Sequence, residues 1–290
     1  MRTAAISVVM ACCCCGCFAP APAAQYVQQA RRLHDGALAS AVVTNPDLRD
    51  YIQLVGRRIV AGARAAEPDR TRDPLFSLVQ FHLVACAVPN VFTTGGEHIY
   101  VCNGLFQLCR DEDELAAAIA HAYAHAVDLD VEHLDLHPDA NVALPLVAWE
   151  FVTHRFTLAQ ERAADQLAFE FYTRAGYDPA KFAALFEHLS TLFPQPAAGD
   201  RVPLVVRARL ARDWAAPAPR ERRPLPVADP RTFVSLRAQA APLNPELTPT
   251  QSQLFLRAFP NCVLSADTPD QQAAQQILRP VPPPTRLEPS

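Results

Sequence analysis

The chain has 290 residues, of which 50% are hydrophobic and 19% are charged, and its formal net charge is −4. This length and composition allow one sizeable core with tails, and the weak negative charge argues against nucleic acid as a general partner. We expect a signal segment over residues 1–24, a folded α+β domain over 25–215, and a Pro-rich, largely irregular or disordered tail over 216–290.

The first 24 residues have the organisation of an export signal. Arg2 precedes an apolar run, residues 4–18, which has the length of a signal-peptide core and is shorter than the roughly 20 residues that span a bilayer. Five of the nine cysteines lie here, and a small residue precedes both Cys12 and Cys17, as in the lipidation box of bacterial lipoproteins. The sequence therefore predicts an exported protein of the periplasm or outer membrane with a lipid anchor on Cys12 or Cys17. Cleavage after an alanine of APAPAA, without a lipid, is the alternative.

Four cysteines follow the signal segment, namely Cys86, Cys102, Cys109 and Cys262. Disulfides are permitted in an exported protein, and four cysteines allow three complete pairings. Two or more of them can equally be buried free thiols.

The first part of the domain alternates between helix and strand patterns. Apolar residues recur at helical spacing from Leu48 to Val60, which predicts an amphipathic helix from about 46 to 63. LFSLVQFHLVACAVPNVF is typical of a strand that enters a loop, and a Gly-Gly turn precedes a short strand over 98–102. Two strands ahead of a helix predict a small sheet packed against helices.

The next helix is expected to begin near Asp111, which can cap it, and Glu114 completes a pattern like that of a capping box. This helix leads into a polar loop over 128–139 that we expect to be solvated. A lid over a cleft and a second metal site are the alternatives for this loop.

Helix patterns continue through the second half of the domain. A long helix is expected to end at Gly176, and KFAALFEHLSTLF and LVVRARLARDW predict two more helices. Beyond residue 216, FVSLRAQ and SQLFLRAF are candidates for short helices within the tail.

Two histidines, His121 and His125, lie four residues apart in DEDELAAAIAHAYAHAVDLD. Side chains at this spacing share one helix face, and both imidazoles can reach one Zn²⁺ ion. A third histidine in an extended motif is excluded because that position is Val131. Glu161, on the following helix, is a better third ligand, and Asp165 one turn later can orient a ligand by a hydrogen bond. The alternatives are two histidines without metal and a solvated carboxylate face.

Three segments occur in a recognisable order and spacing: NPDLRDYIQLVGRRI, PNVFTTGGEHIYVCNGLFQLCRDEDELAAAIAHAYAH and ERAADQLAFEFYTRAGYDP. They resemble the metallopeptidase family that includes the CAAX prenyl endopeptidases, HtpX and periplasmic proteases of outer-membrane assembly. The resemblance covers about residues 45–212 and is most specific over 95–125. It implies a mostly helical, zincin-like fold of the gluzincin type, with Zn²⁺ held by His121, His125 and Glu161, and cleavage of unfolded or misassembled polypeptides.

The resemblance also implies a place for the substrate. In this family the strand that corresponds to 98–102 is an edge strand beside the active-site helix. His98, Ile99 and Tyr100 are therefore expected to hold an extended peptide by strand addition.

The sequence departs from the family motif at the general base. The motif HExxH is HAYAH here, so Ala122 stands where a glutamate takes a proton from the zinc-bound water. Tyr123 lies about 100° further around the helix and has an ordinary pKa near 10, so it is a poor base. Glu97 is conceivable as a replacement, although a turn carboxylate is its ordinary interpretation.

A second departure concerns a His-Pro pair that is followed by an arginine in this branch of the family. The corresponding residues are Val202 and Pro203, with Arg207 or Arg209 after them, so a second active-site histidine is also missing.

These observations predict an exported, lipid-anchored protein of this family that keeps a zinc site but does not hydrolyse peptides efficiently. It is expected to bind polypeptides or an envelope partner through the former substrate cleft. One alternative is an active zinc-dependent endopeptidase acting on unfolded or misassembled envelope proteins. The other is a structural lipoprotein without a metal.

Overall fold

The computed structural model describes residues 28, 31–32, 34–70, 76, 78–85, 90–93, 97–128, 158–192, 203–216 and 229–243. The signal segment with Cys12 and Cys17, the polar loop beyond Asp128, and SQLFLRAF lie outside these residues. None of the described helices combines the length and the apolar composition needed to cross a membrane.

The described chain is mostly helical, with a small sheet, which confirms the expected α+β class. Two short helical turns, η1 (His34–Leu38) and η2 (Ala39–Ala41), come first. The remaining elements, in chain order, are α2 (Pro46–Ala66), η3 (Pro68–Arg70), β1 (Gln80–Val84), β2 (Val91–Thr93), β3 (His98–Cys102), α3 (Asn103–Leu108), α4 (Glu112–Val127), α5 (Leu158–Arg174), α6 (Pro179–Leu192), α7 (Leu204–Ala215), α8 (Pro230–Ala240) and η7 (Ala241–Leu243).

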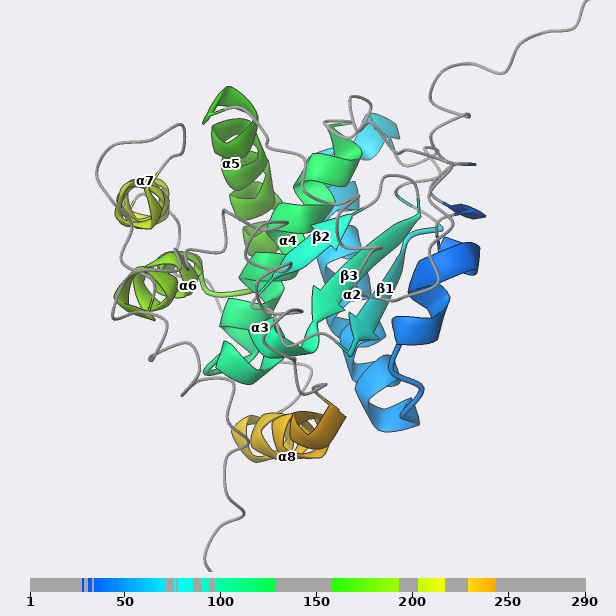
Figure 1. Ribbon diagram of the computed structural model, residues 1–290. Coiled ribbons are helices and arrows are strands. Elements are labelled where there is room, and N and C mark those ends of the chain that lie inside the picture. Colours follow the sequence, from blue (N-terminus) through cyan, green and yellow to red (C-terminus); the bar gives the residue numbers. More distant parts are fainter. Residues whose placement is uncertain are drawn as a thin grey trace, which may run out of the picture.

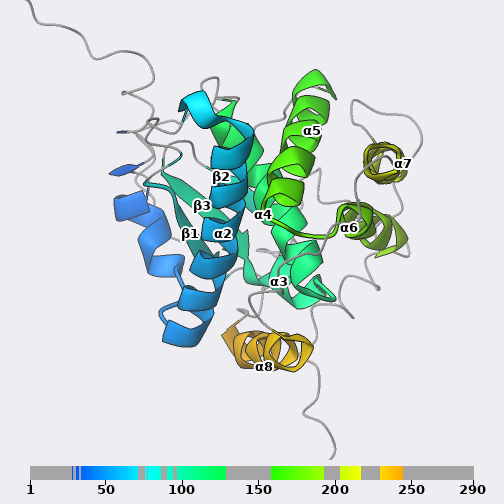
Figure 2. The ribbon, with the colours of Figure 1, turned by 180° about the vertical axis from the view of Figure 1, so that it is seen from behind.

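Helix α2 forms where the apolar spacing predicts it. Asn45 caps it by accepting hydrogen bonds from the backbone N–H groups of Asp47 and Leu48, and Pro46 occupies the first turn, where its missing N–H costs nothing. Its apolar stripe is buried against the sheet and the helices, and α2 lies behind β1 and β3 in Figure 1 and in front of them in Figure 2.

The sheet has the strand order β1-β3-β2. Strand β3 pairs in parallel with β1 and antiparallel with β2, so it is the central strand. The prediction that His98, Ile99 and Tyr100 form a peptide-binding edge is therefore wrong, because both backbone sides of this strand already have partners. The edge of the described sheet that packs on α4 is β2.

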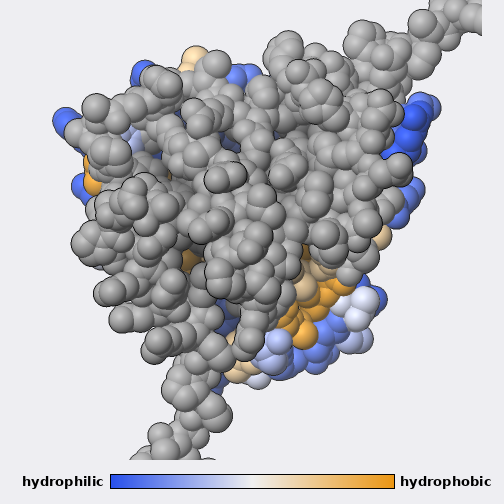
Figure 3. Space-filling model, viewed as in Figure 1, coloured by the Kyte–Doolittle hydropathy of each residue, from blue (hydrophilic) through white to orange (hydrophobic). Residues whose placement is uncertain are grey.

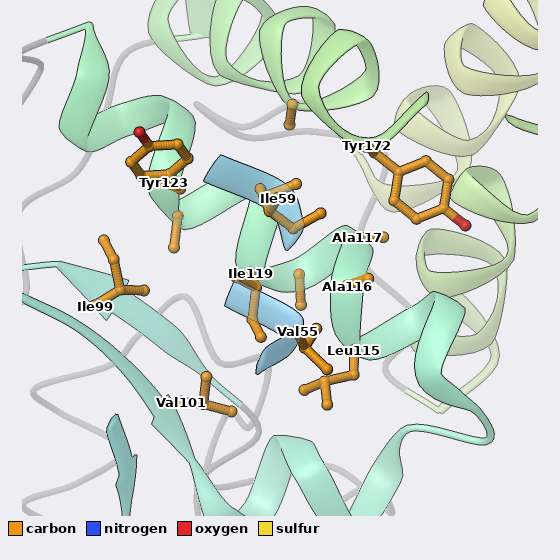
Figure 4. Packing of buried hydrophobic residues seen from close by; sticks show 14 of the residues in the cluster. Val55, Ile59, Ile99, Val101, Leu115, Ala116, Ala117, Ile119, Tyr123 and Tyr172 are labelled. Carbon is orange, nitrogen blue, oxygen red and sulfur yellow. The ribbon is translucent and has the colours of Figure 1, made fainter. Parts of the chain in front are cut away.

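The core lies between the sheet, α2 and α4. Ile99 and Val101 project from β3 towards Ile119 of α4 and Val55 of α2, and all four are fully buried (Figure 4). Successive side chains of a strand point to opposite faces, so His98 and Tyr100 point away from this core. Helix α5 packs along α4 and α2, and α6 and α7 form an outer pair (Figure 1).

Helix α4 begins with three buried carboxylates, which is unusual for a core helix. Asp111 caps the helix by accepting from the backbone N–H of Glu114, as predicted. The Glu114 carboxylate accepts from the backbone N–H and side chain of Arg110, so the reciprocal half of the capping box reaches one residue further back than expected. Glu112 accepts hydrogen bonds from the hydroxyls of Tyr51 and Tyr177. These partners, with the favourable helix dipole, fix the start of the helix.

The two described cysteines of the domain, Cys102 and Cys109, are both buried, and burial raises the pKa of the Cys109 thiol. Helix α5 ends as predicted, with Gly176 at a φ of 86°.

Helix α8, within the segment expected to be an irregular tail, packs Phe233 edge-on against Phe106 of α3, so this part of the segment belongs to the domain core. On the face drawn in Figure 3, the visible described residues form hydrophilic areas along the rim and a hydrophobic area low on the right.

Candidate metal centre

Helices α4 and α5 bring three potential metal ligands together. His121 and His125 of α4 and Glu161 of α5 each offer one ligand atom, and these atoms all lie within 4.8 Å of one another. Nε2 of His121 is 3.5 Å from Oε2 of Glu161, and Nε2 of His125 is 3.8 Å from Oε1. The i, i+4 spacing places both imidazoles over one helix face, and the packing of α5 on α4 supplies the carboxylate.

This donor set fits a zinc ion. Bonds of 2.0–2.2 Å in a tetrahedral site place neighbouring donor atoms about 3.3–3.5 Å apart, close to the separations observed. In addition, Oε2 of Glu161 is buried and accepts no hydrogen bond from the part of the chain that is described. Buried carboxylate oxygens normally accept a hydrogen bond. Nη1 of Arg207, at 3.5 Å, is only an ion-pair contact of this oxygen, so a cation between the imidazoles and Glu161 would still find an acceptor there.

Asp165, one turn after Glu161, contacts the other nitrogen of His121. Its Oδ1 lies 3.0 Å from Nδ1 of His121. If Nδ1 donates its proton to this carboxylate, Nε2 keeps the lone pair that a metal requires. Burial alone would raise the pKa of Asp165, but the charge of Arg207 and the hydrogen bond of His121 outweigh it, and the pKa lies well below its ordinary value.

Arg207 of α7 completes the charge arrangement. Its Nε and Nη2 donate to the two oxygens of Asp165 at 2.7 and 2.6 Å, and Nη1 is 3.5 Å from Oε2 of Glu161. Burial lowers the pKa of Arg207, but the two carboxylates raise it above the ordinary value. Two carboxylates and one guanidinium leave a net charge of −1, so the site still favours a cation.

The sequence did not decide whether Arg207 or Arg209 is the arginine of the site. The structure places Arg207 in the site, while Arg209 is exposed. The sequence signal for this arginine was its position after Pro203. The helical repeat explains the choice, because residues two apart on a helix point in different directions, and only one of the two can face Asp165.

The general-base position holds no acid–base group. Ala122 is 4% exposed and its methyl group joins the core. Tyr123 is fully buried among rings of the core, with Phe81 edge-on at 6.2 Å, so it is no substitute. The carboxylate of Glu97 accepts two hydrogen bonds from Arg31 and is engaged outside this cluster. His98 belongs to a different group of histidines on the opposite face of β3.

Comparison with known proteins agrees with this geometry. Residues 52–137 match the model of peptidase family M48. A stretch of 193 residues is 23% identical to the β-barrel assembly-enhancing protease of Yersinia pestis and covers 57% of this chain and 36% of that protein. A stretch of 48 residues is 38% identical to the mitochondrial metalloendopeptidase OMA1 of Schizosaccharomyces pombe and covers 17% and 14% of the two chains.

This chain therefore spans little more than a third of the longer-matching relative, and neither relative's activity transfers to it by similarity alone. The family match does include most of α2, the sheet and α4 with both histidines, in the order that the sequence motifs predict. Residues 52–137 are therefore similar to peptidase family M48, and within them HAYAH stands in place of the motif HExxH.

Proposed function

We propose that this protein is an exported pseudopeptidase, which holds Zn²⁺ with His121, His125 and Glu161 and binds polypeptides without cleaving them efficiently. One observation carries the proposal: the ligand atoms converge within 4.8 Å, whereas the adjacent base position is a methyl group at Ala122. The ligands, their hydrogen-bonded support and the helix that presents them are all present. The proton acceptor is the missing part.

When bound, zinc would lower the pKa of a coordinated water towards 7. Efficient hydrolysis also needs a side chain that takes the water's proton and delivers it to the leaving amine. Among the described residues near the site, Asp165 is held by Arg207 and Glu161 is needed as a ligand. Loss of a general base typically lowers the rate by about 10²–10⁴-fold, so we expect weak residual activity at most.

For the bound polypeptide we propose β2 rather than β3 as the docking strand. Strand β2 (Val91–Thr93) is the edge of the described sheet and packs on α4, which carries His121 and His125. An extended peptide could add to this edge through main-chain hydrogen bonds, which leaves its side chains to determine specificity. The partner would be an unfolded polypeptide or a protein of the envelope.

The envelope location and the lipid anchor on Cys12 or Cys17 are parts of the same proposal. The signal-like residues 1–24 support export. The Yersinia relative is named for the assembly of β-barrels, which is consistent with an envelope role. Labelling with a fatty-acid analogue, followed by Cys12→Ala and Cys17→Ala variants, tests which cysteine carries a lipid.

The decisive experiment restores the missing carboxylate with Ala122→Glu. We expect wild-type protein to bind zinc and to cleave unfolded casein at background level, and the variant to cleave about 10²–10⁴-fold faster in a zinc-dependent way. Ala163→Glu, which adds the same side chain on an exposed position of α5, is the matched control and should stay at background.

Other outcomes reject defined parts of the proposal. Cleavage by wild type that Glu161→Ala abolishes would show an active endopeptidase. Protein that contains no zinc when purified without chelators would leave a structural lipoprotein as the better description. A zinc-bound Ala122→Glu variant that cleaves nothing would show that the peptide-binding cleft itself has diverged.

A further inference from the structure

A second group of histidines lies on the face of the sheet that points away from α4. His82 of β1 and His98 of β3 are on neighbouring strands, two register positions apart, and His34 comes from η1. Each of the three offers one ligand atom, and these atoms lie within 4.8 Å of one another. Residues separated by 16 and 64 positions in the chain thus converge on one point of the fold.

The rings of this sheet cluster (His34, His82 and His98) are in direct contact. Nε2 of His82 is 3.0 Å from Nδ1 of His98. The rings of His34 and His98 are stacked, with centroids 4.1 Å apart and planes at 4°. The contact between two ring nitrogens requires one of them to carry a proton and the other a lone pair. Two lone pairs on these same nitrogens would instead suit a shared cation.

Tyr100 can orient one ligand of the cluster through a hydrogen bond. Its hydroxyl is 2.9 Å from Nδ1 of His34, and the Tyr100 side chain is fully buried between strand neighbours. Ligating histidines almost always bond a second group through the other ring nitrogen, which sets the tautomer. A proton on Nδ1 of His34, donated to Tyr100, leaves the lone pair on Nε2.

The rings are neutral at neutral pH, as metal ligation requires. Burial, with the neighbouring imidazoles, lowers the pKa of His82 to about 3 and that of His98 to about 4. Burial also lowers the pKa of His34. Of the charged neighbours, Arg31 and Glu97 are paired with each other, and the negative charge of Asp35 only partly offsets the lowered pKa values of His34 and His98.

We propose that His34, His82 and His98 form a second metal site, for a divalent transition-metal ion that prefers imidazole ligands, such as Zn²⁺ or Cu²⁺. Three imidazoles are a sufficient protein ligand set for zinc with one open position, and nitrogen donors also suit Cu²⁺. One of the two stacked rings must turn about its Cβ–Cγ bond to bind, and this torsion is broad. The ion would cross-link η1 to β1 and β3, and so fasten the start of the folded domain to the sheet.

The site is partly accessible. His34 and His82 are only half-buried, whereas His98 is 7% exposed, so an ion can enter from the side of η1. The sheet cluster shares no residue with His121, His125 and Glu161, and the two groups lie on opposite faces of β3. Occupancy of each site can therefore be measured independently.

The test uses the full chain, purified without chelators and without a polyhistidine tag, and counts bound zinc by elemental mass spectrometry. We expect about two equivalents in wild type, one in His34→Gln, one in Glu161→Gln and none in the double variant, since each four-coordinate site holds one ion. His188→Gln, a half-buried histidine of α6 that hydrogen-bonds Glu114, is the control and should keep both ions.

Titration of chelator-treated protein with zinc chloride or copper sulfate measures the affinity. Copper should bind more tightly than zinc. Tyr100→Phe keeps all three imidazoles and should weaken zinc binding by about 10–100-fold, and His34→Gln should weaken it further. Zinc should slow hydrogen exchange in η1 of wild type and of Glu161→Gln, but not in His34→Gln.

The outcomes separate the two sites. A single equivalent that survives His34→Gln and is lost in Glu161→Gln overturns this inference and leaves the proposed function standing. A single equivalent that is lost only in His34→Gln supports the second site and overturns zinc binding by the helix residues His121, His125 and Glu161. Should His34→Gln fail to fold, an unchanged zinc affinity in Tyr100→Phe overturns the second site.

Discussion

The two histidine clusters of this protein hold their imidazoles in different ways. The helix cluster (His121, His125 and Glu161) is supported by charge, through the ion pair of Asp165 and Arg207. The sheet cluster is supported by neutral contacts, namely ring stacking and the hydroxyl of Tyr100. The same ligand type is thus positioned by an ion pair between two helices in one case and by strand register in the other.

The two kinds of support predict that each cluster is sensitive to a different perturbation. A change in charge should damage the helix cluster, because its ligand orientation depends on a buried ion pair. A change in strand position should damage the sheet cluster, because two of its ligands are placed by the pairing of β1 with β3. Altering one kind of support while measuring zinc binding at both clusters therefore tests this comparison.

The largest effect is expected from Asp165→Asn. The substitution keeps the shape of the side chain but leaves Arg207, whose side chain is 14% exposed, without its main partner. Removing one member of a buried ion pair typically lowers the free energy of unfolding by about 3–5 kcal/mol. Zinc binding by the helix cluster should weaken about 10–100-fold, while the sheet cluster keeps its affinity. Urea unfolding and zinc titration measure the two effects.

The double variant Asp165→Asn/Arg207→Met is the control for this prediction. Methionine removes the buried charge while keeping much of the apolar contact with Phe186, whose ring lies 4.4 Å from the guanidinium. We expect part of the lost stability to return, without recovery of zinc affinity. A single variant as stable as wild type would show that Arg207 is not held by Asp165 in solution.

The sequence predicted the helix cluster because its signals are local. The spacing of His121 and His125 is a property of one helix, and Asp111 marks where that helix begins. Glu161 and Asp165 follow the same i, i+4 rule on α5. The family resemblance supplied the step between the helices that local patterns cannot provide.

Strand order and the sheet cluster could not be read in this way. Strand β2 has only three residues and lies where the sequence pattern indicated a loop. The family resemblance implied an edge position for β3, and its pairing with both β1 and β2 contradicts this. The sheet cluster depends on long-range pairing, since His34, His82 and His98 meet only after β1 aligns with β3. The one available signal was the alternation of Phe81, His82 and Leu83, which predicts a face but not a neighbour.

A smaller loss of stability is expected from Gly62→Ala and Gly56→Ala on α2. Each variant creates a steric clash next to one of the two clusters. A Cβ at Gly62 would lie 2.1 Å from the backbone oxygen of Phe171 on α5, and a Cβ at Gly56 would lie 2.2 Å from the ring of Phe81 on β1. Overpacking of this kind costs about 1–3 kcal/mol. We expect Gly62→Ala to lower the stability more, because the backbone of α5 can move away only if the whole helix shifts, whereas the ring of Phe81 is a side chain.

The two alanine variants should also weaken zinc binding at different clusters. Gly62→Ala displaces α5, which carries Glu161, and should weaken the helix cluster more than the sheet cluster. Gly56→Ala displaces Phe81, the neighbour of His82, and should do the opposite. Equal losses at both clusters in zinc titrations would show that the sheet and the helices respond as one unit, and that the proposed independence is wrong.

The smallest effect at neutral pH is expected from Tyr51→Phe at the start of α4. The Tyr51 hydroxyl donates to Oε2 of Glu112 at 3.2 Å, and loss of such a bond costs about 1 kcal/mol. Burial and the charge of Glu112 raise the pKa of Tyr51 above its ordinary value of 10, and burial likewise raises that of Tyr177.

Because these phenols keep their protons in the folded protein while the unfolded chain ionises, their stability contribution is complete below pH 10 and is lost as pH rises above it. Each such tyrosine adds a slope of up to about 1.4 kcal/mol per pH unit. Urea unfolding between pH 8 and 11 measures how the free energy of unfolding changes with pH. Tyr51→Phe should lose the contribution of one tyrosine to this slope, and Tyr51→Phe/Tyr177→Phe should lose the contributions of two. An unchanged slope would mean that Glu112 does not hold these phenols, and that the start of α4 is fixed by Asp111 and Arg110 instead.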